Sequence, residues 1–337
     1  MQELLDVLIV GAGPTGLACA IEAVVRHLKV LVVEKGVLVN SIYHYPSTMT
    51  FFTSRERLEI GDLPLPSLNT KPHRAEALEY YRRVADYYRL PIHFQERVLG
   101  IGGHDGDFHV ATETSEGSRG EYLTKKAIIA TGYYDLPNLL GIPGEELPKV
   151  SHYYTDPHPY YRRRVAVIGA ANSAAVAALD LWRHGAQVTL IYREPALSPH
   201  LKYWIRPDIE NRIKEGAICA LPESEVKEIA PGAIRVHCSN GEVLHVENDF
   251  VFALTGYHPD FRFLRDLGVE VDPATHRPRC DSETLESNVP GIYLAGVIIA
   301  GMDTNEIFIE NGRFHGKQIL GDIEKKNLAV QPAEVSR

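Results

Sequence analysis

Three glycines near the start of the 337-residue chain have the spacing of a dinucleotide-binding loop: Gly11, Gly13 and Gly16. They follow a buried-strand pattern at residues 6–10 and precede an alanine- and leucine-rich helical stretch at 17–27. In such a loop the first glycine permits a tight turn, the second admits a pyrophosphate, and the third lets the helix pack on the strand. A further apolar run, 30–33, leads to Glu34, a carboxylate suited to a ribose without a 2′-phosphate. The pattern predicts a βαβ unit for a dinucleotide such as FAD.

The same series of elements recurs 158 positions later in the chain. An apolar run at residues 165–168 precedes Gly169, and an alanine-rich helical stretch then leads to a second run that ends at Tyr192. Tyr192 falls at the position of Glu34 and is followed by Arg193. A guanidinium there can pair with a 2′-phosphate, which a carboxylate would repel, so this copy predicts NADPH rather than NADH. The alternative is that Arg193 is a solvated charge at the end of a strand.

A third feature lies toward the end of the chain, where a helix is predicted. Residues 303–306 (DTNE) have the form of a capping box before a helical pattern at 307–320. The positive end of such a helix would suit the pyrimidine side of a flavin, where negative charge develops on reduction. An ordinary well-capped helix is the alternative.

Together these signals predict an α/β protein with two Rossmann-like, three-layer domains, in which the NADPH-binding domain is inserted in the FAD-binding domain. Glycines end two further apolar runs, at Thr131-Gly132 and Thr255-Gly256, as suits chain crossings. The predicted parts are a first FAD-binding segment, an NADPH-binding insert, a second FAD-binding segment and a polar tail that is expected to fray, at residues 1–136, 137–257, 258–322 and 323–337.

Composition narrows the class of protein further. A formal net charge of −9 argues against nucleic acid and acidic membrane surfaces as partners. No apolar stretch approaches the roughly 18 residues of a spanning helix, so a cytoplasmic protein is expected. The four cysteines are widely spaced and form no C-x-x-C pair: Cys19, Cys219, Cys238 and Cys280. The 15 histidines show no triad or metal spacing, so neither a disulfide framework nor a metal site is predicted.

Four further segments carry a resemblance to a known family: residues 49–52, 76–84, 295–297 and 305–316 (NEIFIENGRFHG). With them the chain resembles the bacillithiol disulfide reductase family, in the small thioredoxin-reductase-like branch of the pyridine nucleotide-disulfide oxidoreductases. The likeness runs from about Leu5 to Asp322. It implies an FAD-containing reductase that passes electrons from NADPH to the disulfide of an oxidised low-molecular-weight thiol. A homo-oligomer is expected.

The resemblance also implies roles for single residues. Those expected to hold FAD are Gly11, Gly13, Pro14, Thr15, Gly16, Glu34, Lys35, Thr131, Gly132, Gly296 and Glu306. Those expected to hold NADPH are Gly169, Asn172, Ser173, Tyr192 and Arg193. Thr50 is expected near the flavin.

Two departures from the relatives concern cysteine. Thioredoxin reductases carry a redox C-x-x-C ahead of the second glycine loop, but residues 151–161 contain no cysteine, which excludes protein-disulfide reduction by that route. Many members of the bacillithiol family place a cysteine where this chain has Thr15. Cys19, one helical turn on, is a candidate substitute nucleophile. The simpler interpretation is a small apolar residue that packs the first helix on the sheet.

The leading hypothesis is hydride transfer from NADPH to FAD, followed by electron delivery to a small disulfide of the bacillithiol type. Three alternatives stay open. A ferredoxin- or flavodoxin-NADP reductase needs no cysteine and takes a small electron-carrier protein as its partner. A flavin-dependent monooxygenase has a linker signature of which residues 146–153 supply only the Ser-His part. A nucleotide-bound redox sensor would not be an enzyme.

Overall fold

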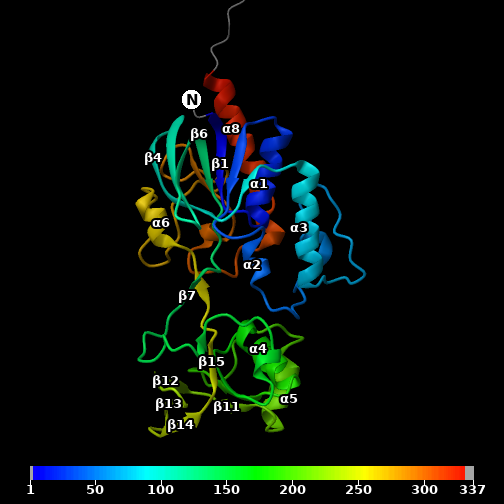
Figure 1. The fold of residues 1–337 in the computed structure, drawn as a ribbon, viewed down its shortest axis with the longest axis vertical. Helices are drawn as coiled ribbons and strands as arrows, with labels where there is room; N and C mark the ends of the chain where they lie inside the picture. Colours follow the sequence, from blue (N-terminus) through cyan, green and yellow to red (C-terminus); the bar gives the residue numbers. More distant parts are fainter. Residues whose placement is uncertain (1–2, 331–337) are drawn as a thin grey trace, which may run out of the picture. The chain divides into compact units, whose positions relative to one another are not determined.

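The computed structural model describes residues 3–330, which form two compact units (Figure 1). The first unit joins both ends of the chain, up to Leu136 and from Tyr257 onward. The second is the continuous segment Pro137–Gly256. The chain therefore passes between the units twice, and two short strands, β7 (Leu136–Pro137) and β16 (Tyr257–His258), pair at these passages.

The first unit contains a seven-stranded sheet and the helices that cover it. Its strands are β1 (Leu4–Val10), β2 (Val30–Val33), β3 (Ile92–His93), β4 (Glu96–His104), β5 (Asp107–Thr114), β6 (Arg119–Ile129) and β17 (Ile292–Leu294). Strands β3, β2, β1, β6 and β17 are parallel, whereas β4, β5 and β6 pair antiparallel. Its helices are α1 (Pro14–Val25), α2 (Asn40–Tyr43), α3 (Arg74–Tyr88), α6 (Phe261–Asp266), α7 (Ile309–Gly312) and α8 (His315–Val330), with 3-10 turns η1 (Arg55–Arg57) and η3 (Gly296–Ala300).

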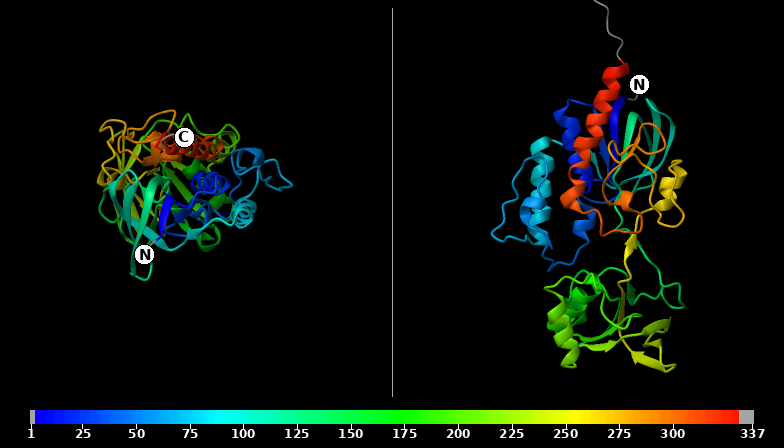
Figure 2. Two further views of the ribbon diagram at one scale, coloured as in Figure 1. Left: turned by 90° about the horizontal axis from the view of Figure 1, so that it is seen from above. Right: turned by 180° about the vertical axis from the view of Figure 1, so that it is seen from behind.

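Strand β1 shows why this unit has three layers. Successive side chains of a strand point to opposite faces of its sheet. Val7 and Ile9 accordingly pack in one apolar core with residues of α1, α3 and α8, the helices seen on one face of the sheet in Figure 2. Leu8 and Val10 pack in another core with residues of β4, β5 and α6. The strand is buried on both faces, as its continuous apolar run predicts.

The second unit repeats this plan. Its sheet has the order β11 (Cys219–Leu221), β10 (Gln187–Ile191), β9 (Arg164–Ile168), β15 (Phe250–Ala253), β8 (Val150–Ser151). A separate antiparallel sheet consists of β12 (Ser224–Ile229), β13 (Ala233–Cys238) and β14 (Val243–Glu247). Its helices are α4 (Asn172–Arg183) and α5 (Arg206–Lys214), with the 3-10 turn η2 (His158–Tyr160).

Strand β9, which lies 158 positions after β1, also sends alternate side chains into two cores, one on each face of its sheet. Val165 and Val167 pack in a core with residues of α4 and α5. Ala166 and Ile168 pack on the other face with apolar residues of β12 and β13. The prediction of two Rossmann-like three-layer domains, one inserted in the other, is therefore confirmed.

The helix predicted at residues 307–320 is right in type but wrong in its start and its continuity. The chain instead forms α7, a single short turn, and then α8. The expected capping box does not form because the carboxylate of Glu306 pairs with Arg277, while Asn311 Oδ1 accepts the backbone N–H of Phe308 at 2.8 Å. The cap therefore lies several residues later than the sequence pattern suggests.

The polar tail predicted from residue 323 is also wrong for the part that the structure describes. Helix α8 continues to Val330, and Ile323 is fully buried in the core that α8 shares with α1. Lys326 pairs with Asp322 one turn earlier at 2.8 Å and with Glu286. Buried Ile323 and these ion pairs keep a polar sequence helical. Residues 331–337 lie outside the described part of the chain.

Candidate functional site: two dinucleotide loops

The first and third glycines of the first loop are required by close packing. Gly11 has φ +108°, and a Cβ on it would lie 2.6 Å from the carbonyl oxygen of Ala130 at the end of β6. A Cβ on Gly16 would lie only 2.0 Å from the carbonyl oxygen of Gly11. β1, α1 and the end of β6 approach so closely at this turn that no side chain fits at Gly11 or Gly16.

The middle glycine is different. Gly13 has the ordinary extended conformation of an N-cap, with φ −72° and ψ 171°. Within the described chain, no atom beyond its sequence neighbours lies within 4 Å of the position that its Cβ would take. The space above Gly13 therefore suits a pyrophosphate, held by the unpaired N–H groups at the positive end of α1. Pro14 occupies the first turn of α1, where a missing N–H is tolerated.

Glu34, the residue predicted to bind a ribose, also holds this loop in place through hydrogen bonds to its backbone. Its Oε2 accepts the N–H of Ala12 at 2.7 Å, and its Oε1 accepts the N–H of Gly36 at 2.8 Å. Burial raises the pKa of Glu34, and the two N–H donors partly oppose that shift. Each carboxylate oxygen keeps a second lone pair for a hydroxyl donor. Lys35 is exposed and pairs with Asp135 at 2.8 Å.

Thr15 lies where the first loop meets the last part of the chain. A Cβ on Gly296 would lie 3.2 Å from Thr15 Oγ1, and a Cβ on Gly312 would lie 2.8 Å from the same atom. The backbone N–H of Gly296 donates to Nδ1 of the buried His315 at 3.0 Å. Gly296, predicted from the resemblance to hold FAD, therefore adjoins the first loop, although it lies 285 residues from Gly11 in the sequence.

Two other predicted FAD residues have different partners. Glu306 is engaged by Arg277. Thr50 is exposed, and its Oγ1 lies 3.0 Å from Nδ1 of His73, the N-cap residue of α3. Thr131 and Gly132 follow β6 beside Gly11. The structure thus groups the glycine loop, Glu34, Thr131, Gly132 and Gly296, while Thr50 and Glu306 are held in separate contacts.

The second loop is closed in the same way with an alanine in place of a glycine. Gly169 has φ +141°, and a Cβ on it would lie 2.6 Å from the carbonyl oxygen of Leu254 and 3.1 Å from the Cβ of Ala174. Ser173, at the start of α4, is exposed. Asn172 Oδ1 accepts the N–H of Lys202 at 2.9 Å. The side chain of Asn172, predicted to hold NADPH, thus anchors the loop around residue 202.

Tyr192 and Arg193 follow β10 and differ in exposure. Tyr192 is buried, and burial raises the pKa of its hydroxyl. Arg193 is exposed. The hydrogen bond from Lys227 lowers the pKa of Glu225, and the charge of Arg193 adds to that effect. Arg193 is therefore an exposed cation directly after β10, close enough to Glu225 to stabilise the carboxylate of that residue.

We expect Arg193→Ala to raise the KM for NADPH about tenfold or more and to leave that for NADH nearly unchanged. A charge-assisted contact with a phosphate contributes about 1.5–3 kcal/mol, which is a factor of ten or more. Steady-state kinetics with both nucleotides measures this. Arg163→Ala is the matched control, because Arg163 is exposed but precedes β9, whereas Arg193 follows the parallel neighbour β10, so the two lie at opposite ends of these strands. Equal losses with both nucleotides would assign Arg193 a structural role.

Cys19 is unsuited to be a nucleophile. It has no solvent exposure and lies in the core between α1 and the sheet. Burial raises the pKa of the Cys19 thiol to about 12, so almost none of it is thiolate at neutral pH. Cys219 and Cys238 lie in the second unit, and Cys280 is half-buried on the other face of the first sheet.

We expect Cys19→Ala to leave NADPH-driven flavin reduction and substrate turnover intact. Alanine is preferred to serine because it adds no polar group to a fully buried position. Stopped-flow absorbance of the flavin and steady-state turnover check the two half-reactions separately. A variant whose flavin is reduced normally but whose disulfide turnover is lost would make Cys19 the nucleophile after all.

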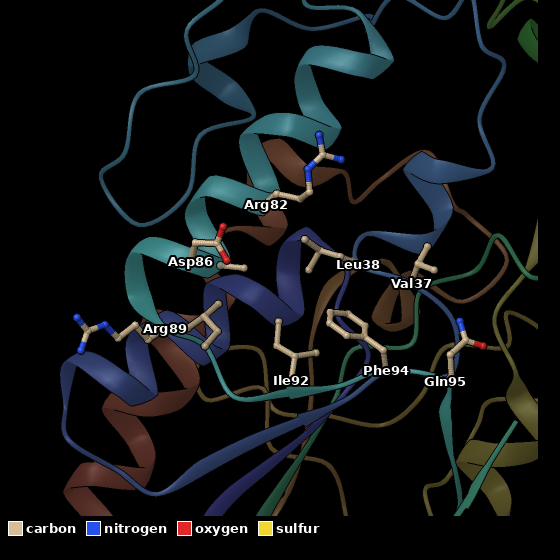
Figure 3. Close-up of a pocket in the computed structure, with 10 residues that line it drawn as sticks. Val37, Leu38, Arg82, Asp86, Arg89, Ile92, Phe94 and Gln95 are labelled. Atoms are coloured by element: carbon tan, nitrogen blue, oxygen red, sulfur yellow. The ribbon is translucent and has the colours of Figure 1, made fainter. Parts of the chain in front are cut away.

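A pocket of about 690 Å³ lies in the first unit, between the last turns of α3, the segment after Gly36 and the edge strand β3 (Figure 3). Apolar side chains including Leu38, Ile92 and Phe94 line it, with Arg82 and Arg89 at its margin. None of the residues predicted to bind a nucleotide lines it.

Within residues 3–330, no helix is long and apolar enough to cross a membrane, and no His, Cys, Asp and Glu side chains gather as metal ligands would.

Comparison with known proteins identifies the family. The family model described as pyridine nucleotide-disulphide oxidoreductase matches residues 8–296, which include both glycine loops. The chain belongs to this family. It is therefore an oxidoreductase that binds a flavin and a pyridine nucleotide, which confirms the prediction of an enzyme of this type.

Single relatives of the pyridine nucleotide-disulphide oxidoreductase family agree. The chain is 46% identical to bacilliredoxin reductase Bdr of Bacillus subtilis, over 95% of this chain and 97% of the relative. A solved structure of bacillithiol disulfide reductase Bdr from Bacillus cereus superposes with a TM-score of 0.94 at 45% identity, covering 96% of this chain and all of that one. A ferredoxin-NADP reductase of Ignicoccus hospitalis is 27% identical, over 87% of this chain and 90% of the relative. The resemblance stated from the sequence is confirmed.

Sequence reasoning missed His315 and Gly312. Both lie in the segment 305–316 that carried the resemblance, but they have no spacing that marks a nucleotide site. Only the fold shows that Gly312 adjoins Thr15 and that His315 accepts a hydrogen bond from Gly296. The repeated glycine of that segment, at 312 and 316, was the available signal of close packing.

Proposed function

We propose that the protein is an FAD-dependent oxidoreductase that takes a hydride from NADPH and reduces the disulfide of an oxidised low-molecular-weight thiol of the bacillithiol type. The observation that carries this proposal is the near-full-length similarity to proteins named bacilliredoxin reductase and bacillithiol disulfide reductase, at 46% and 45% identity. We further propose a cytoplasmic location, where thiols are kept reduced.

FAD would lie on the first loop. The open space at Gly13 and the N-terminus of α1 fit its pyrophosphate, and the free lone pairs of Glu34 fit an adenosine ribose. The turn at Gly296 would border the same site. When bound, the flavin accepts two electrons from a nicotinamide and passes them to an acceptor.

NADPH would lie on the second loop, with its pyrophosphate at the N-terminus of α4. Arg193 follows the strand where an NAD site carries an acid, and its exposed guanidinium supports a 2′-phosphate. Overall, NADPH, one proton and one disulfide would give NADP⁺ and two thiols. The S–S bond breaks and two S–H bonds form.

The test of this proposal is a two-stage anaerobic experiment. The purified protein is first reduced with NADPH while the flavin absorbance is followed. It is then mixed with bacillithiol disulfide, with oxidised ferredoxin or with oxygen in separate runs. Rapid re-oxidation by the disulfide alone supports the proposal. Absence of bindable flavin, or re-oxidation by every acceptor except the disulfide, contradicts it.

One observation favours a second candidate, a ferredoxin- or flavodoxin-NADP reductase. Thr15 replaces the cysteine found in many bacillithiol relatives, and Cys19 is buried with a raised pKa. An enzyme that passes single electrons to a carrier protein needs no thiol. The ferredoxin arm of the same experiment decides between the two, since faster re-oxidation by ferredoxin than by disulfide would establish this candidate.

A further inference from the structure

The first residue of α8, His315, is buried where α8 meets η3 and α1 in the first unit. Only 9% of its surface is exposed. Its Nδ1 accepts the backbone N–H of Gly296, at the start of η3, at 3.0 Å. The next residue, Gly316, packs so closely on α1 that a Cβ would lie 2.7 Å from the carbonyl oxygen of Ala18. The close packing of Gly316 on α1 therefore fixes the start of α8, from which the imidazole projects.

The hydrogen bond defines the state of the ring. An imidazole nitrogen that accepts a bond carries no proton, so His315 is neutral with its proton on Nε2. Burial lowers the pKa of His315 to about 4, which keeps this form at neutral pH. The acceptor for the Gly296 N–H is thus permanent under ordinary conditions.

Gly296 is the residue that His315 controls. Its φ of +83° lies in the region that favours glycine, and a Cβ there would lie 3.2 Å from Thr15 Oγ1. A glycine in a turn can adopt several backbone paths, and the bond to Nδ1 selects one of them. That path sets how closely the turn approaches the first loop.

We infer that His315 is a positioning residue of the flavin site: by accepting the Gly296 N–H it fixes the turn after β17 against Thr15 and the first loop. The inference rests on the proposed function, in that the first loop is taken as the FAD site. It adds a residue that touches neither the loop nor the disulfide, and that acts only through the backbone of Gly296.

Three variants separate this role from others. In His315→Asn, the Oδ1 atom can take the place of Nδ1 as acceptor. In His315→Gln, a polar atom falls near the Nε2 position instead. His315→Leu fills a similar volume without any acceptor. An acceptor role predicts that Asn is tolerated and that Gln and Leu are not, whereas a role of Nε2 predicts the opposite order for Asn and Gln.

The measurement is FAD retention by the full-length holoprotein through gel filtration, with the dissociation constant of FAD from fluorescence titration. We expect His315→Leu and His315→Gln to weaken FAD binding roughly tenfold, the effect of one buried hydrogen bond, and to shift the visible flavin spectrum. His315→Asn should stay within about threefold of wild type with an unshifted spectrum. Equal losses in all three variants, or unchanged binding in His315→Leu, would overturn the inference.

Two further points keep the test decisive. If His315→Leu does not fold, the comparison of Asn with Gln gives the same answer. Long-range ¹H–¹⁵N NMR of the wild-type imidazole should show Nδ1 without and Nε2 with a proton, and the reverse tautomer also overturns the inference. Failure of the proposed function is a different result, since a protein that binds FAD but turns over no disulfide still yields the ratio of affinities.

Discussion

A protein in which Gly13 is replaced by leucine is expected to fold normally and to be isolated without flavin. The backbone of Gly13 has dihedral angles that any residue can adopt, and a Cβ meets no other atom of the described chain within 4 Å beyond its sequence neighbours. A leucine side chain would instead occupy the space proposed for the pyrophosphate. The ratio of flavin to protein absorbance after purification measures the loss, which we expect to be essentially complete.

Gly16→Ala is the matched comparison because it adds a smaller group at a worse place. Its Cβ would lie 2.0 Å from the carbonyl oxygen of Gly11, so the turn between β1 and α1 must distort. This variant should lower the thermal midpoint even without flavin, whereas Gly13→Leu should match flavin-free wild type. Normal flavin content in the Gly13→Leu protein would show that the dinucleotide does not lie on this loop.

The second large effect is a loss of stability in mild acid that originates at His315. Burial lowers its pKa from 6.5 to about 4 in the folded protein. Between these values the unfolded chain binds more protons than the folded one, so the free energy of unfolding falls as the pH falls. Above pH 6.5 both states are neutral at this residue and the contribution is complete. A shift of this size corresponds to about 3 kcal/mol, most of which is lost by pH 4.

Denaturant unfolding of wild type and His315→Asn at pH 7 and pH 4 isolates this contribution. Carboxylates elsewhere also titrate in this range, but they do so in both proteins. The variant should therefore lose about 3 kcal/mol less than wild type on acidification. Parallel losses in the two proteins would mean that folded His315 takes up its proton as readily as the unfolded chain does, so that its pKa is not lowered.

Much of the fold could be predicted because the pattern of each βαβ unit lies in one short stretch of sequence and occurs twice in the chain. The apolar runs that became β1 and β9 are buried on both faces, and their alternate residues enter equivalent cores 158 positions apart. The loop glycines could be predicted from their spacing because a side chain at each position would meet either the backbone or the space proposed for the pyrophosphate. Tyr192 and Arg193 were found only because the two copies are in register.

The errors arose where contacts distant in sequence override a local pattern. The residues from Asp303 to Glu306 read as a helix cap, but Arg277 takes the carboxylate of Glu306. The stretch from residue 323 reads as a polar tail, but Ile323 and Lys326 find partners on α1, β17 and the segment around Glu286. His315 has no signature at all, since its importance depends on Gly296 approaching from another part of the chain.

The divided first unit also has a consequence for how the protein is made. Its sheet is incomplete until β17 has been added beside β6, and α8 is needed to cover α1. The second unit, in contrast, is complete once Gly256 has left the ribosome. Because domains fold as units during synthesis, the middle of the nascent chain can reach its native state before the beginning does. Until the segment after Tyr257 emerges, the apolar side chains of α1 that α8 will cover stay exposed to solvent.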